Sequence, residues 1–188
     1  MLPSDNAMTH TKIRRKDRAV YDDVWIEAFL LRAPVITVSF TDGEQPLIKP
    51  TLFVYDPGRR AVYFHATAFG RTTETLKTHP RAAFTAFEMG RLLPADRAMS
   101  FSLEYASVVA YGRIAVIEKD EEATAGLQLL LDKYFPHLRP GEDYAPVHPE
   151  ELKITAVFRF DIDDWAGKRK AVADDFPGAF FWGEEGGA

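Results

Sequence analysis

The alternation of apolar and polar residues along the chain predicts a protein built mainly of β-strands. In residues 155–162 every second side chain, from Ala156 to Ile162, is apolar, and Arg159 and Asp161 lie between them. A period of two is typical of a strand with one buried face. Five more segments have a strand-like composition between turn residues: 35–40, 47–55, 61–65, 81–88 and 105–118.

Three segments have helical signals instead: residues 24–33, residues 70–78, and a stretch that starts at Asp120 and ends before Pro136. In the first of these, the spacing places Val24, Ala28 and Leu31 on one face. The third carries an apolar stripe, which we interpret as packing, that includes Leu127, Leu130 and Leu131.

Turn residues indicate how the strands connect. Asp56-Pro57-Gly58 predicts an antiparallel hairpin, because proline presets φ and glycine accepts a positive φ. Pro50 cannot donate to a β-ladder, so its strand should lie at a sheet edge or carry a bulge. Gly112, inside a long strand, predicts a bulge or a close approach by another backbone or a ligand.

Composition favours a single globular domain, since 46% of the 188 residues are hydrophobic. The pattern predicts a mainly β protein with short helices, arranged as an antiparallel barrel or strongly curved sheet. We place the folded core at about residues 14–170, with flexible arms at 1–13 and 171–188.

Charge and cysteine content exclude several classes of protein. With 23 basic and 28 acidic residues, the chain lacks the broad basic surface of a non-specific nucleic-acid binder. There is no cysteine and the five histidines are scattered, so no metal site is predicted. Neither a secretory signal nor a membrane-spanning segment is evident, which favours a cytoplasmic protein.

The clearest chemical signal lies in residues 62–76, VYFHATAFGRTTETL, where a strand leads into a helix. Gly70, Arg71 and the threonines around them are the groups that a phosphate needs at a helix N-terminus: free N–H groups, a guanidinium fork and hydroxyls. The alternative is structural, in which the threonines only cap the helix and Arg71 is a solvated surface charge. The segment alone leaves both interpretations open.

Two longer stretches, IKPTLFVYDPGRRAVYFHATAFGRTTETL and YASVVAYGRIAVIE, resemble the pyridoxamine 5'-phosphate oxidase-like FMN-binding split-barrel superfamily, and within it the nitroimidazole-resistance branch. The shared features are a Pro-Gly hairpin, Tyr-Phe-His followed by a Gly-basic pair, and Tyr-x-Ser-Val with a glycine four residues after the valine. The similarity extends from about Arg14 to Lys168. It implies a six-stranded antiparallel split barrel, bound FMN, and a homodimer with the cofactor in clefts between the subunits.

The resemblance also implies roles for individual residues. Lys49, Pro50, Thr51 and Leu52 would line the cofactor, followed by His65, Ala66 and Thr67. Arg71 and Thr72 would hold the phosphate, Ser107 and Val108 would contact the flavin, and Trp165 and Lys168 would face the cofactor or substrate from the partner subunit. The chain departs from the family pattern at Thr72, where relatives often carry a second basic residue, and at the bulky Phe69.

His65 has three interpretations: a structural hydrogen-bonding residue at a strand end, a catalytic residue that positions substrate or donates a proton near the flavin, or an iron ligand. The leading functional hypothesis is an FMN-dependent oxidoreductase that passes electrons or hydride from a reduced nicotinamide donor to a small oxidised substrate such as a nitroaromatic. A flavin or haem carrier or sensor without turnover is the alternative. Oxidation of a pyridoxal-type amine is a third hypothesis, but no second Arg/His cluster supports it near the C-terminus.

Overall fold

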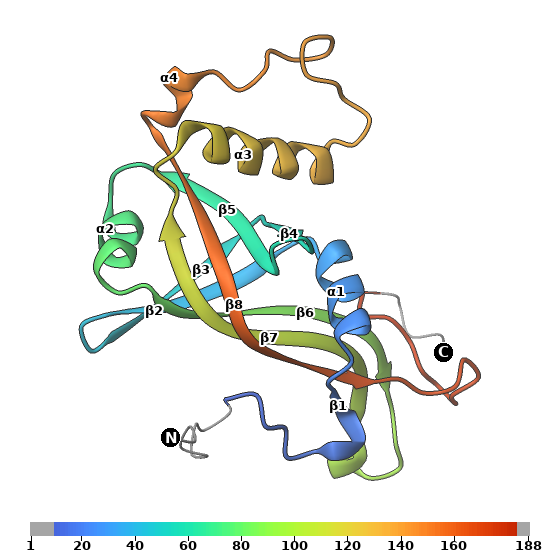
Figure 1. Ribbon diagram of the computed structural model, residues 1–188. Helices are drawn as coiled ribbons and strands as arrows, with labels where there is room; N and C mark the ends of the chain where they lie inside the picture. The colour runs from blue at the N-terminus through green and yellow to red at the C-terminus, as the bar shows by residue number, and fades with distance from the viewer. Residues whose placement is uncertain (1–9, 184–188) are drawn as a thin grey trace.

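The computed structural model describes residues 10–183, which form one antiparallel sheet with helices around it (Figure 1). The strands are β1 (Ala19–Val20), β2 (Ile36–Asp42), β3 (Gln45–Thr51), β4 (Val54–Asp56), β5 (Ala61–Thr67), β6 (Arg81–Leu93), β7 (Ser102–Val116) and β8 (Thr155–Lys170). The helices are α1 (Asp23–Arg32), α2 (Arg71–Thr78), α3 (Asp120–Tyr134) and α4 (Pro149–Leu152), with short 3₁₀ turns at Lys16–Arg18 and Ala98–Ser100. None of the helices within this range is long and apolar enough to cross a membrane.

The mainly β, antiparallel prediction is confirmed, but the number of strands is not six. The described residues form an eight-stranded sheet in the order β3-β2-β6-β7-β8-β5-β4, with β1 paired to β8. One predicted strand, 47–55, is interrupted at Leu52 and Phe53 and becomes β3 and β4. The other additional strand, β1, is only two residues long and carries no readable periodicity.

The interruption after β3 lets the sheet turn back on itself. β3 and β4 stand at the two ends of the hydrogen-bonded order, yet only Leu52 and Phe53 separate them in the chain. The sheet must therefore curl until its two ends meet. Pro50 lies in β3, which pairs only with β2 among the described residues, so the prediction of an edge position for this proline is confirmed.

The tyrosine at the end of α3 stabilises this break. The Tyr134 hydroxyl accepts a hydrogen bond from the backbone N–H of Phe53 at 3.0 Å and lies 2.6 Å from the carbonyl oxygen of Pro34. Phe53 is fully buried, so its backbone N–H would otherwise lack a partner once it leaves the ladder.

Aromatic side chains from the inner face of the curled sheet fill the core. Phe64 stacks on Phe158 with ring centroids 4.9 Å apart, and Phe84 meets Phe160 edge to face at 5.0 Å. Phe158 and Phe160 belong to the alternating pattern in β8, whose buried face is as predicted. The strand itself is longer than predicted and continues to Lys170.

Gly112 permits the closest approach between β7 and β8. The register shifts between Tyr111 and Gly112, and a Cβ at position 112 would lie 2.0 Å from the carbonyl oxygen of Asp161. The predicted bulge and close approach are both confirmed, since only glycine fits beside this backbone.

The predicted apolar face of α1 is wrong. The helix buries Ile26, Phe29 and Leu30, whereas Val24 and Leu31 are 75% and 51% exposed. Apolar residues occur on both sides of α1, so periodicity alone could not identify the side that meets the sheet.

Candidate functional site

A polar cleft opens where β5 runs into α2. Its volume is about 570 Å³. The lining residues come from β3, β5, the β5–α2 connection, α2 and the start of β8: Lys49, His65, Ala66, Thr67, Phe69, Gly70, Arg71, Thr72, Thr73, Ile154 and Thr155. Six of these were predicted to bind the cofactor: Lys49, His65, Ala66, Thr67, Arg71 and Thr72.

The N-terminus of α2 presents free backbone donors to this cleft. Gly70 is the N-cap, with φ of 124° and no side-chain capping bond, and the first helical hydrogen bond runs from the Glu74 N–H to the Gly70 carbonyl. The three preceding N–H groups, of residues 71–73, have no acceptor within the helix. Together with the positive end of the helix dipole they form an anion-binding arrangement.

The threonines of the cleft are partly committed to the fold. Thr73, only 3% exposed, donates its hydroxyl hydrogen to the Thr67 carbonyl at 2.9 Å, and the Thr67 hydroxyl donates to the Phe69 carbonyl at 2.7 Å. These bonds shape the connection before α2, but they do not cap the helix as the structural interpretation expected, because both hydroxyls donate to carbonyl groups and Gly70 has no side-chain capping bond. The Thr72 side chain has no such bond in the described residues and lines the cleft beside Arg71.

Lys49 and His65 meet in this cleft although their strands are far apart in the sheet order. Partial desolvation lowers the pKa of the His65 imidazole, and the positive charge of Lys49 lowers it further. Both effects favour the neutral imidazole, in which one ring nitrogen carries a proton and the other can accept a hydrogen bond. No ion pair involves Lys49 or Arg71 within residues 10–183, so both cations remain available to an anion.

A second pocket, about 370 Å³ in volume, adjoins the cleft and shares His65, Ile154 and Thr155 with it. We call it the apolar pocket. Its remaining lining comes from the β3–β4 break, from α3 and from the segment that follows α3: Leu52, Leu127, Leu130, Leu131, Tyr134, Phe135, Val147 and Glu151. From the sequence we interpret the α3 leucines as packing residues, and the structure shows that they also line this pocket. An apolar stripe on a helix does not reveal whether the helix packs against another element or borders a cavity.

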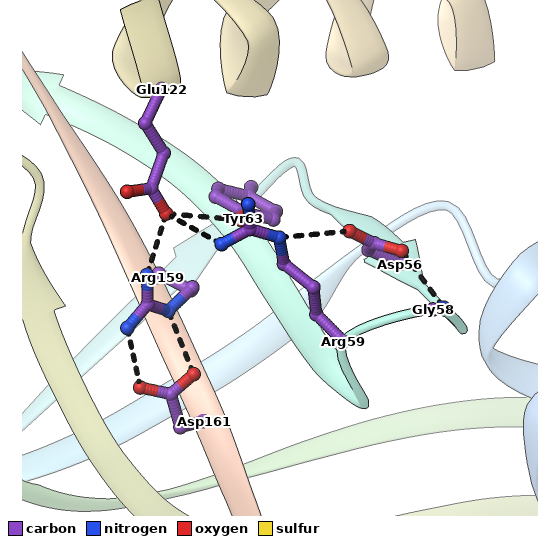
Figure 2. Close-up of polar contacts among 7 residues, drawn as sticks. All are labelled: Asp56, Gly58, Arg59, Tyr63, Glu122, Arg159 and Asp161. Carbon is purple, nitrogen blue, oxygen red and sulfur yellow. Dashed lines mark hydrogen bonds and ion pairs between the residues drawn. The ribbon is translucent and has the colours of Figure 1, made fainter. Parts of the chain in front are cut away.

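An ion-pair network holds α3 over the sheet beside this pocket (Figure 2). Glu122 of α3 accepts hydrogen bonds from Arg159 of β8 at 2.5 Å and from Arg59 at 3.2 Å. The Tyr63 hydroxyl donates to the same carboxylate oxygen at 3.3 Å. Arg159 also pairs with Asp161, so the network connects α3 to both β5 and β8.

The other predicted cofactor residues do not line the cleft within this chain. Ser107 and Lys168 are opposite each other on β7 and β8 and line a separate pocket on the outer face of the sheet. Val108 and Trp165 are buried in the core, and the Trp165 indole N–H donates to Asp23 at 2.7 Å.

Two more predicted residues, Pro50 and Thr51, lie in the chain between Lys49 of the polar cleft and Leu52 of the apolar pocket. Pro50 is exposed on β3, and the Thr51 hydroxyl donates to the Leu52 carbonyl at 3.1 Å. Neither residue lines either cavity. Ile154 and Thr155 were missed in the sequence because nothing marks the first residues of β8 as neighbours of Thr67. The register pairs Thr155 with Thr67.

No group of three metal-ligating side chains occurs within residues 10–183.

The family model described as pyridoxamine 5'-phosphate oxidase matches residues 22–169. No curated protein matches the chain.

Several solved structures share the fold. The flavocytochrome Anf3 from Azotobacter vinelandii is 26% identical, with a TM-score of 0.74, over 89% of this chain and 77% of its own. A candidate 5-nitroimidazole antibiotic resistance protein from Bacteroides thetaiotaomicron is 23% identical, with a TM-score of 0.65, over 80% of this chain and 86% of its own. The FAD and heme binding protein from Mycobacterium smegmatis is 20% identical, with a TM-score of 0.73, over 84% of this chain and 76% of its own.

Proposed function

The chain belongs to the pyridoxamine 5'-phosphate oxidase family, and from this premise we propose that it is an FMN-dependent oxidoreductase of the split-barrel type. It would pass electrons or hydride from a reduced nicotinamide donor to a small oxidised substrate, of which a nitroaromatic is one example. The bound flavin supplies the redox chemistry, and the protein supplies binding, orientation and electrostatics.

The observation that carries this proposal is the anion-binding end of the polar cleft. Free N–H groups of α2, the Arg71 guanidinium and the Thr72 side chain converge there, and Lys49 adds a cation from β3. A phosphate monoester is dianionic near neutral pH, so it would be stabilised both by the charges and by the helix dipole. Lys49 thus compensates for the missing second basic residue after Arg71.

We extend the proposal to a homodimer in which Ser107 and Lys168 contact the flavin held by the partner's cleft. The register places Phe87, Ser107 and Lys168 in one row across β6, β7 and β8. On this outer face Phe87, Met89 and Val109 are 59%, 43% and 36% exposed. An apolar sheet face of this kind is typical of an interface between subunits.

His65 would act at the reacting end of the flavin. Its neutral imidazole can donate one hydrogen bond and accept another, so it can orient a substrate oxygen or deliver a proton to it. Desolvation and the charge of Lys49 lower the pKa of the imidazole and so favour its neutral form.

The first test is the affinity for FMN of Arg71→Ala, measured by quenching of flavin fluorescence. Loss of a charge-assisted bond to phosphate should weaken binding by about 10- to 100-fold. Arg113→Ala is the matched control, since Arg113 is exposed on β7 and lines neither the polar cleft nor the apolar pocket. Unchanged affinity in Arg71→Ala would mean that the phosphate lies elsewhere.

Haem binding is the second candidate function. The neutral His65 ring borders the apolar pocket, and the similar Anf3 protein is a flavocytochrome. A Soret band in the purified protein, lost in His65→Ala, would support a haem site. A yellow protein that bleaches with NAD(P)H supports the reductase, and a flavin that stays oxidised supports a carrier.

A further inference from the structure

We propose that the apolar pocket beside His65 is a substrate pocket that binds small, uncharged aromatic molecules. Its role in catalysis rests on the proposed flavin function, whereas its binding preference can be measured without flavin. The pocket joins the polar cleft through His65, Ile154 and Thr155.

The lining of the pocket determines the class of ligand. Seven of its side chains are aliphatic or aromatic hydrocarbons: Leu52, Leu127, Leu130, Leu131, Phe135, Val147 and Ile154. Such a surface binds apolar rings by removing them from water and by dispersion contacts. The volume of about 370 Å³ is at the lower end of the range for small-molecule sites.

The charge of the lining excludes acidic ligands. No lysine or arginine lines the pocket, and Glu151 is its one ionisable acid. The Glu151 carboxylate accepts a hydrogen bond from the His148 N–H at 2.8 Å as part of the cap of α4, so it is held at the wall. A negatively charged ligand would meet repulsion there and would find no lysine or arginine in the lining to pair with.

This charge pattern also argues against haem as the occupant of the pocket. Haem carries two carboxylates, but no lysine or arginine lines the pocket, and Lys49 and Arg71 line the polar cleft, where the flavin phosphate is proposed to bind. A compact neutral ring needs neither cation.

His65 supplies the polar contact at the junction of the two cavities. Its ring can donate a hydrogen bond to an oxygen on the aromatic ligand, while the apolar part of the ligand fills the space under α3. The ligand's reacting group would then point towards the polar cleft.

Two fluorescent probes with one ring skeleton test the proposal on the full chain as purified. N-phenyl-1-naphthylamine is neutral, and 1-anilinonaphthalene-8-sulfonate adds a sulfonate to the same skeleton. We expect the neutral probe to bind with at least a tenfold lower Kd. Equal or tighter binding of the sulfonate would overturn the charge argument, and a Soret band in the purified protein would overturn the assignment of the occupant.

Substitutions on α3 locate the binding. Leu131→Trp should fill the pocket and raise the Kd of the neutral probe at least tenfold. Leu129→Trp is the matched control because Leu129 is exposed on α3 and does not line the pocket. If the neutral probe binds wild type and Leu131→Trp with the same Kd, the proposal is wrong. If Leu131→Trp does not fold, the comparison of the neutral and sulfonated probes on the wild-type protein still tests the proposal.

Glu151→Gln isolates the local charge. Glutamine keeps the capping bond to the His148 N–H, so the wall of the pocket should be preserved. The sulfonated probe should then bind several-fold more tightly and the neutral probe equally. No change for the sulfonate would remove Glu151 as the selective group. If the neutral probe binds and FMN does not, the proposed flavin function is wrong but the ligand preference of the apolar pocket is supported. If FMN binds and the neutral probe does not, only the proposal for the apolar pocket is wrong.

Discussion

At the residue scale, His65 connects the two cavities and its protonation state depends on its surroundings. Burial lowers the pKa of the imidazole more than Lys49 does, since desolvation is the larger of the two causes. The native pKa is thus lower than that of the unfolded chain. Between the two values the unfolded state binds more protons, so the contribution of His65 to stability is lost as the pH falls through this window.

Lys49→Met should raise the pKa of His65 towards its ordinary value without reaching it, because the desolvation remains. The measurement is an NMR titration of the His65 ring protons. Lys77→Met, on the exposed last turn of α2, should leave the midpoint unchanged. A midpoint that does not move in Lys49→Met would show that the two side chains do not interact.

At the scale of elements, α3 forms one wall of the apolar pocket, and the Glu122 carboxylate in its first turn connects the helix to the sheet. Glu122 takes hydrogen bonds from Arg59, Tyr63 and Arg159 (Figure 2). The carboxylate is only 22% exposed and Arg159 only 24%, so solvent screens this pair less than a surface ion pair.

Glu122→Gln should lower the free energy of unfolding by about 1–2 kcal/mol, because the charge-assisted hydrogen bonds to the carboxylate become neutral ones. The amide group also has only one acceptor oxygen, and its N–H₂ group cannot accept a hydrogen bond from the arginines or from Tyr63. Urea unfolding followed by circular dichroism measures the change. Glu121→Gln is the control, since Glu121 is exposed on the same turn, and should stay within about 0.5 kcal/mol of wild type. Equal changes in the free energy of unfolding for the two substitutions would show that the network stabilises the fold no more than an ordinary surface charge does.

The elements also show which predictions local patterns can support. The helices at 24–33 and 70–78, the hairpin at Asp56-Pro57-Gly58 and the bulge at Gly112 were predictable, because turn residues, caps and alternation act over a few residues. The expected positive φ at Gly58 was wrong, since Arg60 adopts it instead, at 51°. The break at Leu52 and Phe53 was not, since the partner that compensates it is Tyr134, some eighty positions away.

At the scale of the whole molecule, the proposed dimer decides whether each flavin contacts one chain or two. Ser107 and Lys168 lie on the outer sheet face with Phe87, while the anion-binding groups surround the polar cleft. The outer pocket that contains Ser107 and Lys168 also includes Lys12 and Arg14, so this face carries positive charge beside its apolar row.

Phe87→Glu should convert the proposed dimer to a monomer and lower FMN occupancy, because a carboxylate would replace an apolar contact and lose its hydration at the interface. Sedimentation velocity across a range of concentrations gives the oligomeric state. Val24→Glu is the control, since Val24 is an exposed apolar residue on α1, away from this face, and the substitution should leave the dimer intact. If Val24→Glu is a monomer and Phe87→Glu remains a dimer, the interface lies on α1. If the wild-type protein is a monomer, the proposal of a flavin site shared between two subunits is wrong.

The sequence by itself determined the β-rich class and most strand and helix positions, because these depend on local spacing and residue type, and its motifs indicated the family that the comparison confirmed. For residues 62–76 it supplied an anion-binding hypothesis and left the structural alternative open. Only the tertiary structure decided that Lys49 meets His65, that leucines of α3 line a pocket, and that Ser107 and Lys168 lie apart from the polar cleft. The physical reason is that closure of the sheet joins strands that are distant in its hydrogen-bonded order. It depends on the simultaneous packing of many residues that no short pattern relates.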